Sequence, residues 1–407
     1  MHGPRIHTAL IAVLAVTGLL AHGKPAFAQP RRSELIRERL KTRPDDPTLY
    51  YYLALAEFAE GNRPGGLEAL EKVADLGHGF LPVRGMGFDA VWGDSAFQNV
   101  RGRLEKKLPR VTSARELFRL DRQLIPEGIA WDPQSRCYFV GSVAASRIIR
   151  IDARGKVSDF AVAGELRQVL GLALDAGRRR LHAVSTTLVE GARDSVSNRV
   201  VTYDLATGAR VRSVAVPAAT QLNDVTVAAS GELYTTDSGA GGVYRIRESG
   251  VVDTLVATGR LPGVNGVAIS SDGTGLYLAH STGIARFEFA TGELLPRIEV
   301  PPGETIAAID GLYADGHTLI GIQNVTNPGR VIRIHLRADG KGAERIETLL
   351  SHHHPAIDEP TTGVIVGRSF ALLATTQVAR FKPDGTLESP ETLKRPVALM
   401  VSLAPKR

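Results

Sequence analysis

The sequence has 407 residues, of which 43% are hydrophobic and 23% are charged, a composition typical of a folded globular protein. Its formal charge of +6 is spread along the chain without a long basic run, which argues against binding to nucleic acid or to an acidic membrane surface. Cys137 is the only cysteine, which excludes an intrachain disulfide. The length suffices for one large domain and one small one.

Residues 1–28 have the pattern of a secretory signal peptide. A short stretch with one arginine precedes the apolar run Thr8–Ala21, which is too short to span a bilayer comfortably. Ala26-Phe27-Ala28 then supplies the small residues of a cleavage site. We therefore expect an exported protein that is periplasmic or secreted. No second apolar run approaches membrane-spanning length.

Residues 29–111 show the apolar spacing of helices. Ser33 is placed to cap a first helix, and Pro47 marks the start of a second. Further helices are expected over 64–77 and after Asp94. The second and third helices resemble a single tetratricopeptide repeat. Such a pair suits either of two roles, a helix-turn-helix that docks on the rest of the chain or a groove that contacts another protein.

Residues 112–407 contain a short pattern that occurs six times, with a small second residue followed by a brief apolar strand. The first residues of successive copies are between 42 and 53 positions apart, close to the length of one propeller blade. Turn signals such as Ser271-Asp272-Gly273 separate the strands, and no helical period lies between them. The pattern predicts an all-β domain, a six-bladed β-propeller whose copies begin at Glu127, Leu170, Asn223, Asn265, Asp310 and Thr362.

The third copy shows the four strands of one blade, which we expect at 223–228, 232–237, 243–247 and 251–257. The apolar segment 116–120 precedes the first copy. We expect it to pair as an outer strand of the sixth blade and so close the ring, which removes exposed sheet edges.

The first residues of the six copies are expected to form a ring of their own. The innermost strand of each blade lines the central channel and starts at the same mouth, so these residues converge there. The second strand runs antiparallel to the first and ends at that mouth. It adds further polar residues there: Ser142, Asp237 and Ser238, His280 and Ser281, and Gln323 and Asn324.

Two carboxylates and two carboxamides would share this mouth, from Glu127, Asp310, Asn223 and Asn265. Carboxylates that close repel each other unless a cation lies between them. Oxygen ligands favour a hard divalent ion, with Ca²⁺ the first candidate and Zn²⁺ or Mg²⁺ as alternatives. No cysteine or paired histidine supplies the softer ligands of a structural zinc site. The simpler interpretation is that these polar groups only cap the starts of strands.

These motifs resemble the senescence marker protein/gluconolactonase/luciferin-regenerating-enzyme-like family. The matching residues are Glu127 in Pro-Glu-Gly, Asn265 in Asn-Gly-Val-Ala-Ile-Ser-Ser-Asp-Gly and Asp310 in Asp-Gly-Leu. The resemblance covers about residues 116–403. It implies a six-bladed propeller in which these three residues hold a divalent metal and Asp310 also serves as base. Asn223 matches a substrate-contacting asparagine of the family, and the paraoxonases, lactonases of similar build, use such an asparagine as a calcium ligand.

Two positions depart from the family pattern. Gln221 stands where sugar-lactonase members carry an arginine, which argues against an anionic or sugar-acid substrate. Leu170 occupies the ring position of the second copy and leaves no place there for the catalytic histidine of a paraoxonase. Thr362, neutral, is expected at the rim. The candidate substrate contacts are Asn223, Gln221, Asp237 and Thr362.

The arrangement predicts hydrolysis of a lactone or an ester. A divalent ion would polarise the substrate carbonyl, and Asp310 or Glu127 would accept a proton from the attacking water. His280 either assists this transfer or is an ordinary strand-end histidine bonded to the backbone. Asp237 is either an acid that supports the site or a turn residue that binds its own backbone.

Two other charged runs are expected to face solvent. Three consecutive residues of an extended strand cannot all face one ion, so His352-His353-His354 is interpreted as a solvated loop at the mouth. Arg178-Arg179-Arg180 falls at a hairpin and is interpreted as a solvent-facing turn. No Gly-x-Ser-x-Gly motif occurs, so a serine hydrolase has no support.

Three functions remain open at this point. The first is an exported, calcium-dependent lactonase or esterase, gluconolactonase-like, that acts on a small molecule. The second is a non-catalytic propeller that binds a ligand or a protein, with the helical segment as a docking arm. The third is a strictosidine-synthase-like enzyme on the same scaffold.

Overall fold

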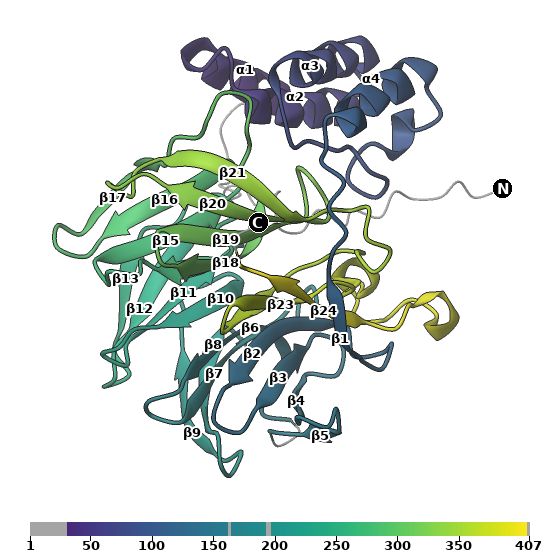
Figure 1. Ribbon diagram of the computed structural model, residues 1–407. Helices are drawn as coiled ribbons and strands as arrows, with labels where there is room; N and C mark the ends of the chain where they lie inside the picture. Colours follow the sequence, from purple (N-terminus) through teal and green to yellow (C-terminus); the bar gives the residue numbers. More distant parts are fainter. Residues whose placement is uncertain (1–30, 162–163, 193–196, 405–407) are drawn as a thin grey trace, which may run out of the picture.

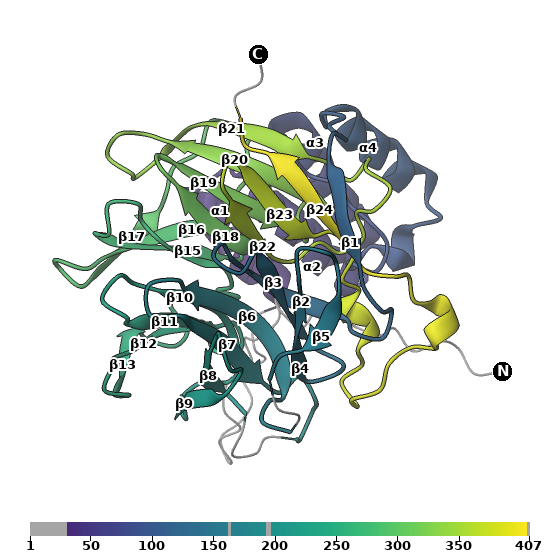
Figure 2. The same ribbon diagram turned by 60° about the horizontal axis from the view of Figure 1, so that its bottom comes forward.

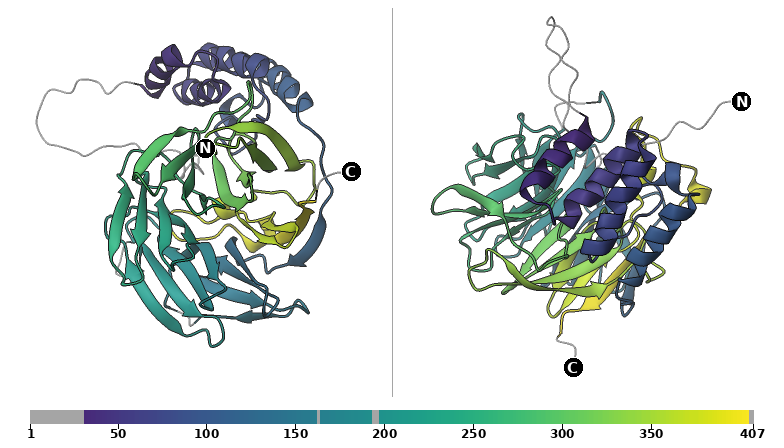
Figure 3. Two further views of the ribbon diagram at one scale, coloured as in Figure 1. Left: turned by 60° about the vertical axis from the view of Figure 1, so that its left-hand side comes forward. Right: turned by 90° about the horizontal axis from the view of Figure 1, so that it is seen from above.

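A computed structural model describes residues 31–161, 164–192 and 197–404. The predicted signal peptide, residues 1–28, lies outside the described residues. Within them, six four-stranded antiparallel sheets follow one another around a ring, and four α-helices lie together on one side (Figures 1 and 3). The predicted six-bladed propeller with an N-terminal helical segment is confirmed.

The first five blades each run in chain order from an inner strand to an outer one. Blade 1 contains β2 (Pro126–Asp132), β3 (Cys137–Ser142), β4 (Arg147–Ile151) and β5 (Val157–Asp159). Blade 2 contains β6 (Gln168–Asp175), β7 (Arg180–Thr186), β8 (Arg199–Asp204) and β9 (Arg210–Ala215). Blade 3 contains β10 (Leu222–Val227), β11 (Leu233–Asp237), β12 (Gly242–Ile246) and β13 (Val252–Val256), each close to its predicted range. Blade 4 contains β14 (Val267–Ile269), β15 (Gly275–His280), β16 (Gly283–Glu288) and β17 (Glu293–Arg297). Blade 5 contains β18 (Ile309–Asp315), β19 (Thr318–Gln323), β20 (Arg330–Leu336) and β21 (Ala343–Leu350).

Blade 6 is assembled from both ends of the propeller sequence. Its inner strands are β22 (Gly363–Val366), β23 (Ser369–Leu373) and β24 (Val397–Ser402), and β1 (Arg115–Arg119) pairs with β24 as the outer strand (Figure 2). Two short 3₁₀ helices, η2 (Val378–Arg380) and η3 (Pro390–Thr392), lie in the loop between β23 and β24. The expected closure by segment 116–120 is confirmed.

Four inner strands carry a β-bulge where the repeat begins. The pairing register shifts between Pro126 and Ile129, Val169 and Leu172, Leu222 and Val225, and Ile309 and Leu312. A bulge leaves one residue unpaired and turns the neighbouring side chains. The bulge therefore sets the direction in which the side chains of the first two residues of each of these copies point.

Glycine at the second position of the repeat lets neighbouring inner strands come into close contact. A Cβ at Gly171 would lie 2.9 Å from the carbonyl oxygen of Asn223 in the next copy. A Cβ at Gly266 would overlap the Asp310 carbonyl oxygen and lie 2.6 Å from the Leu312 nitrogen. These contacts are to backbone atoms, which cannot rotate away as a side chain can. The first residue of one copy is therefore held against the glycine of the copy before it.

The helical segment contains α1 (Arg32–Thr42), α2 (Pro47–Ala59), α3 (Arg63–Leu76), the short 3₁₀ helix η1 (Asp89–Val91) and α4 (Ser95–Lys106). Asp46 and Asp94 cap α2 and α4, each accepting two backbone N–H groups. Buried aromatic rings from Tyr51 and Phe97 hold the helices together. No helix in the described part of the chain is long and apolar enough to cross a membrane.

Ser33 does not cap the first helix. It lies inside the first turn of α1, and its hydroxyl donates to the Glu60 carboxylate, 2.6 Å away. The prediction of Ser33 as a cap was wrong because its partner lies at the end of α2, 27 positions along the chain.

The helical segment docks on the loops of blades 4 and 5 that lie at the same mouth as the repeat starts. Thr48 Oγ1 lies 3.1 Å from Thr305 Oγ1, and the Tyr52 hydroxyl donates to the Ser281 carbonyl oxygen at 2.7 Å. The docked position is fixed on the outer side by an ion pair of Asp46 with Arg297 at 2.6 Å. The helices therefore flank the channel mouth on this side.

The turn of the three consecutive histidines lies beside the docked helical segment. Ser351, which precedes them, accepts a hydrogen bond from the Val111 N–H at 3.1 Å. His352 Nε2 lies 3.8 Å from a carboxylate oxygen of Glu105 in α4. The interpretation as a solvated loop holds only in part, because all three histidines are half-buried and His352 lies against α4.

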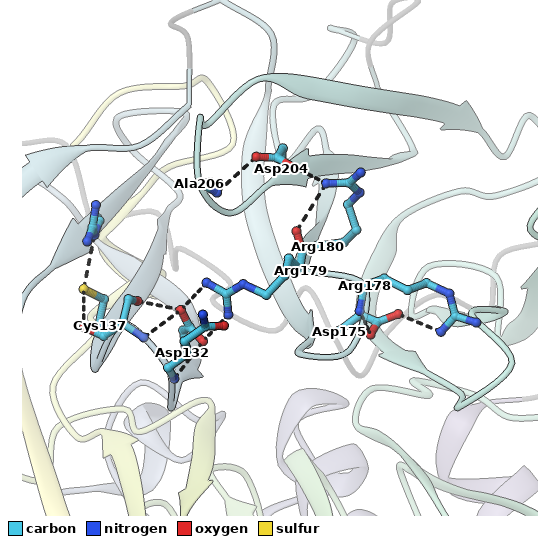
Figure 4. A network of polar contacts seen from close by, with 11 residues as sticks. Asp132, Cys137, Asp175, Arg178, Arg179, Arg180, Asp204 and Ala206 are labelled. Carbon is cyan, nitrogen blue, oxygen red and sulfur yellow. Dashed lines mark hydrogen bonds and ion pairs between the residues drawn. The ribbon is translucent and has the colours of Figure 1, made fainter.

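The three arginines at 178–180 lie at the hairpin between β6 and β7 and bind carboxylates (Figure 4). Arg179 donates twice to Asp132 of blade 1, at 2.6 and 2.8 Å, while Arg178 and Arg180 pair with Asp175 and Asp204 of blade 2. Hydrogen bonds from Arg179 hold the pKa of the buried Asp132 well below its usual range. The expected turn is confirmed and Arg178 is exposed, but Arg179 and Arg180 are half-buried because they pair with carboxylates of blades 1 and 2.

We expect Arg179→Ala to lower the free energy of unfolding by about 2 kcal/mol, because a buried carboxylate loses its cation while Arg179 itself is partly exposed. The pKa of Asp132 is depressed in the folded protein, so this stabilisation is present above pH of about 4 and fades as the pH falls further. Urea unfolding from pH 3 to pH 8 measures both effects. Arg260→Ala, at an exposed position, is the control; equal loss in both variants would contradict the expectation.

Gly266→Ala is expected to lower the free energy of unfolding by about 3 kcal/mol, because the new methyl group meets backbone of blade 5. Gly102→Ala in α4 is the matched control. It has no atom within 4 Å of the added Cβ, and should stabilise the protein by about 0.5 kcal/mol through helix propensity. Denaturant melts of the two variants compare them directly. Unchanged stability of Gly266→Ala would show that the inner strands can separate at little cost.

Candidate functional site

The first residues of the repeats lie side by side at one mouth of the channel. The Thr362 hydroxyl donates to the Glu127 carbonyl oxygen, which joins the sixth copy to the first. The Asn265 side chain hydrogen-bonds to the Asp310 carboxylate, and the charge of Asp310 raises the pKa of Glu127. The structure therefore brings Glu127, Asn265 and Asp310 together, with Thr362 beside them.

Asp310 has one carboxylate oxygen held by donors and one without a partner. Asn324 donates to Oδ2, whereas Oδ1 is buried and has no hydrogen-bond partner among the described residues. Burial, with the charges of Asp224 and Glu359, raises the pKa of Asp310 to about 7, and the Asn324 hydrogen bond acts against this rise. Oδ2 is thus held by a hydrogen bond, and Oδ1 is available to bind a ligand.

Glu127, like Asp310, has a buried carboxylate with one unpartnered oxygen. Only 5% of the residue is exposed, and its Oε2 has no hydrogen-bond partner in the described part of the chain. Burial raises the pKa of this carboxyl well above its usual range, and the charges of Asp310 and Glu359 add to the effect. A hydrogen bond from Thr361 acts in the opposite direction. Each of the two ring acids therefore carries one buried oxygen that is free to bind.

Both ring carboxamides are oriented through their nitrogen atoms. Asn223 Nδ2 donates to the Ser238 hydroxyl at 2.9 Å, and that hydroxyl donates to the Val264 carbonyl oxygen at 2.6 Å. Asn265 is bonded to Asp310, and an ionised carboxylate only accepts, so the nitrogen is again the engaged atom. The amide oxygens of both residues are the groups left for a cation.

Asp224 is a third acid at the ring that the sequence analysis did not single out. It occupies the position that glycine holds in the other five copies. Its carboxylate accepts from the Val267 N–H of blade 4 at 3.1 Å and from the Val225 N–H at 2.8 Å. Burial raises its pKa to about 7. An aspartate at a glycine position of the repeat was the signal that could have found it.

Glu359 is a fourth acid, in the loop ahead of the sixth copy. Its backbone φ of 58° lies in the left-handed region, which is uncommon for glutamate. The Ala379 N–H points at its carboxylate, at 3.1 and 3.2 Å from the two oxygens. Burial raises the pKa of Glu359 to about 7, and its charge raises the pKa of Glu127 and Asp310. No sequence signal marks it, because it lies outside the repeat.

Asp237 acts as a turn residue. Its two carboxylate oxygens accept from four backbone N–H groups, those of Thr220, Gln221, Gly239 and Ala240. This fixes the backbone at Gln221, whose half-buried side chain stands two positions before Asn223. The structure thus places Gln221 next to the ring and gives Asp237 the role of shaping its loop.

His280 lies at the end of β15, on the side of the helical segment. Its Nδ1 lies 3.4 Å from the Thr282 nitrogen, the bond of a strand-end histidine. Burial, together with the charges of Arg297 and Arg43, lowers its pKa to about 4. Its charged neighbours are therefore arginines of the docking contact.

The donor set at the ring fits a hard divalent ion. Among the described residues, no three side chains of His, Cys, Asp or Glu gather closely enough to hold a metal. An ion at the ring would use the unpartnered oxygens of Glu127 and Asp310 together with the amide oxygens of Asn223 and Asn265. Such an all-oxygen set suits Ca²⁺ better than a softer metal.

Two hollows of about 340 Å³ each lie away from the ring. One lies between the α1–α2 loop and blade 4, and is lined by residues that include Arg43, Asp46 and Arg297. The other lies on the helical segment beside Tyr50 and Lys72. Neither of these two hollows includes a ring residue, and the ring acids themselves are buried.

Solved structures share this fold at low sequence identity. A gluconolactonase from Xanthomonas campestris is 18% identical, with 72% of this chain and 98% of that chain covered and a TM-score of 0.50. A luciferin-regenerating enzyme is 14% identical, with 71% and 96% covered and a TM-score of 0.51. A calcium-binding protein, regucalcin, from Agrobacterium tumefaciens is 16% identical, with 72% and 97% covered and a TM-score of 0.50.

Sequence comparison identifies the family directly. A search of curated proteins gave no match to the chain. Residues 125–351, more than half of the chain, match the family described as SMP-30/Gluconolactonase/LRE-like region. The segment includes the ring residues from Glu127 to Asp310. The chain therefore belongs to the SMP-30/gluconolactonase/luciferin-regenerating-enzyme-like family.

Proposed function

We propose that this protein is a metal-dependent hydrolase of a lactone or an ester, and that the reaction takes place at the ring. The observation that carries the proposal is the pair of buried, unpartnered carboxylate oxygens on Glu127 and Asp310. A buried polar atom without a partner needs an explanation such as a bound ion, and here two such atoms belong to acids whose charges act on each other. The family includes a gluconolactonase of the same fold, which supports the reaction class.

Glu127, Asn223, Asn265 and Asp310 are the residues that would hold the ion. When bound, a divalent ion such as Ca²⁺ polarises a substrate carbonyl and stabilises negative charge on its oxygen. A calcium-binding protein of the same fold supports this choice of ion.

Asp310 is the proton acceptor in this proposal. Its carboxylate would accept the proton of the attacking water, and Asn324, which donates to Oδ2, holds that carboxylate in place. Burial and the neighbouring acids make Asp310 more basic than an exposed aspartate, which suits a general base near neutral pH. Thr362 and Gln221, at the sixth and third copies, are the neutral groups beside the ring that would orient the substrate.

A second candidate is a non-catalytic propeller that binds a cation or small ligand. The low exposure of the ring acids favours it, since Glu127 is 5% and Asp310 is 6% exposed. Both candidate functions include a cation site, but only the hydrolase would turn over a substrate.

Export to the periplasm or beyond stays a prediction, because it depends on residues 1–28.

Asp310→Asn is expected to reduce kcat for lactone hydrolysis by at least about 10²-fold, because the amide keeps the shape but cannot accept the proton. Purified protein with Ca²⁺ would be assayed on a lactone and ester panel by acid release. Glu344→Gln, an exposed site, is the control and should keep the full rate. Full turnover by Asp310→Asn would remove Asp310 from the mechanism.

Calcium is expected to raise the melting temperature of the full chain, since a ligand at 100 times its Kd stabilises the folded state by about 2.7 kcal/mol. The shift should vanish with a chelator and in Glu127→Gln, which removes one ligand charge. Differential scanning calorimetry with Ca²⁺, Mg²⁺ and Zn²⁺ would also rank the ions. Indifference to all three would reject the metal site, while stabilisation without turnover would favour the second candidate.

A further inference from the structure

One sector of the ring is apolar. Leu170 fills the ring position of blade 2 and is only 3% exposed. It belongs to the same hydrophobic cluster as Ile125 and Val143 of blade 1 and Leu222 of blade 3. The ring therefore has polar residues on blades 1, 3, 4 and 5 and a hydrocarbon side chain on blade 2.

Two loop segments meet beside this sector. One is residues 187–192, after β7 in blade 2, and the other belongs to the loop that joins β23 to β24 in blade 6. The Glu190 N–H donates to the Pro383 carbonyl oxygen at 2.8 Å, and a Cβ added at Gly385 would lie 3.3 Å from a methyl carbon of Val189. Their apolar side chains extend the cluster of Leu170, and we call them the apolar bridge: Leu188, Val189, Val378, Phe381, Leu387 and Leu393.

The apolar bridge borders the ring acids. The Leu188 N–H donates to the Gln168 side chain at 3.1 Å, and Gln168 stands two positions before Leu170 on the inner strand β6. Val378 precedes Ala379, whose N–H donates to Glu359. Glu359 in turn raises the pKa of Glu127 and Asp310. The hydrocarbon surface and the carboxylates therefore share the mouth.

Four side chains of the bridge are only partly buried and so remain open to contact: Leu188, Val189, Val378 and Leu387. They offer no hydrogen-bonding group to a polyol, whose hydroxyls would lose water without gaining partners. An aliphatic group on the same surface would gain by leaving water.

We infer that the substrate is a lactone or ester with an aliphatic substituent, which lies against Leu188, Val189 and Val378 while its carbonyl faces the ring. This inference rests on the proposed function for the reaction itself. The neutral Gln221 beside the ring agrees with it, because no positive side chain is placed there for an anionic substrate.

The test uses the full chain with Ca²⁺ and γ-lactones whose alkyl substituent grows from none to six carbons, with glucono-δ-lactone as the polar comparison. Each added methylene group is expected to raise kcat/KM about three-fold while it is buried on the bridge. Val378→Gln should weaken the dependence of kcat/KM on the length of the alkyl substituent. Val251→Gln, at a position 53% exposed on blade 3, should leave it unchanged. Leu188→Ala replaces Val378→Gln if the latter does not fold.

Binding of alkyl γ-lactams, which resist hydrolysis, separates the two proposals. Calorimetry should show tighter binding with chain length in the parent protein and a weaker trend in Val378→Gln. If no lactone is hydrolysed but this trend appears, the apolar site stands and the hydrolase proposal fails. If lactones are hydrolysed with equal kcat/KM at every chain length, or glucono-δ-lactone is preferred, the aliphatic inference is overturned.

Discussion

The close contact of neighbouring inner strands is the constraint on which the site depends. Glycine at the second position of the first, second, fourth and fifth copies lets each of these strands lie close to the next, and the ring acids Glu127 and Asp310 are buried there. In that setting the pKa values of Glu127, Asp224 and Asp310 respond mainly to burial, to each other and to hydrogen-bond donors. Buried carboxylates must bind protons or be balanced by a positive charge. The packing of the strands thus creates the demand for a cation.

The repeat made most of the fold predictable from sequence. The residue type at its second position, its turns and its strand lengths recur. A strand that is hard to assign in one blade can therefore be assigned by comparison with the other blades. The same regularity located Glu127, Asn265 and Asp310 at one mouth. Local capping signals also gave the starts of α2 and α4, where Asp46 and Asp94 accept backbone N–H groups a few positions away.

Where the sequence-based expectations were wrong or incomplete, the deciding contact is distant in sequence. Ser33 binds Glu60, Arg179 binds Asp132, and His352 lies against Glu105 of α4. None of these contacts leaves a local pattern. Glu359 escaped notice for a related reason, since it enters the site from an irregular loop whose path is fixed by tertiary contacts.

Two unlike structures flank the ring. The helical segment covers the mouth loops of blades 4 and 5 through contacts such as Thr48 with Thr305. The apolar bridge covers the opposite side through blades 6 and 2. Access to the acids is therefore narrowed from both sides, which explains why they are buried although they stand at the end of a channel. Both covers lie outside the repeat, so they can differ between proteins that share the propeller.

The pairing of β1 with β24 has a consequence for the order in which the protein assembles. Glu127 and Thr362 are 235 positions apart, yet they touch across the seam between the first and last blades. While that seam is open, Glu127 of blade 1 stands apart from the last blade. Closing it brings Glu127 near Glu359, whose charge raises the pKa of Glu127, so a cation bound there would favour the closed ring over the open one.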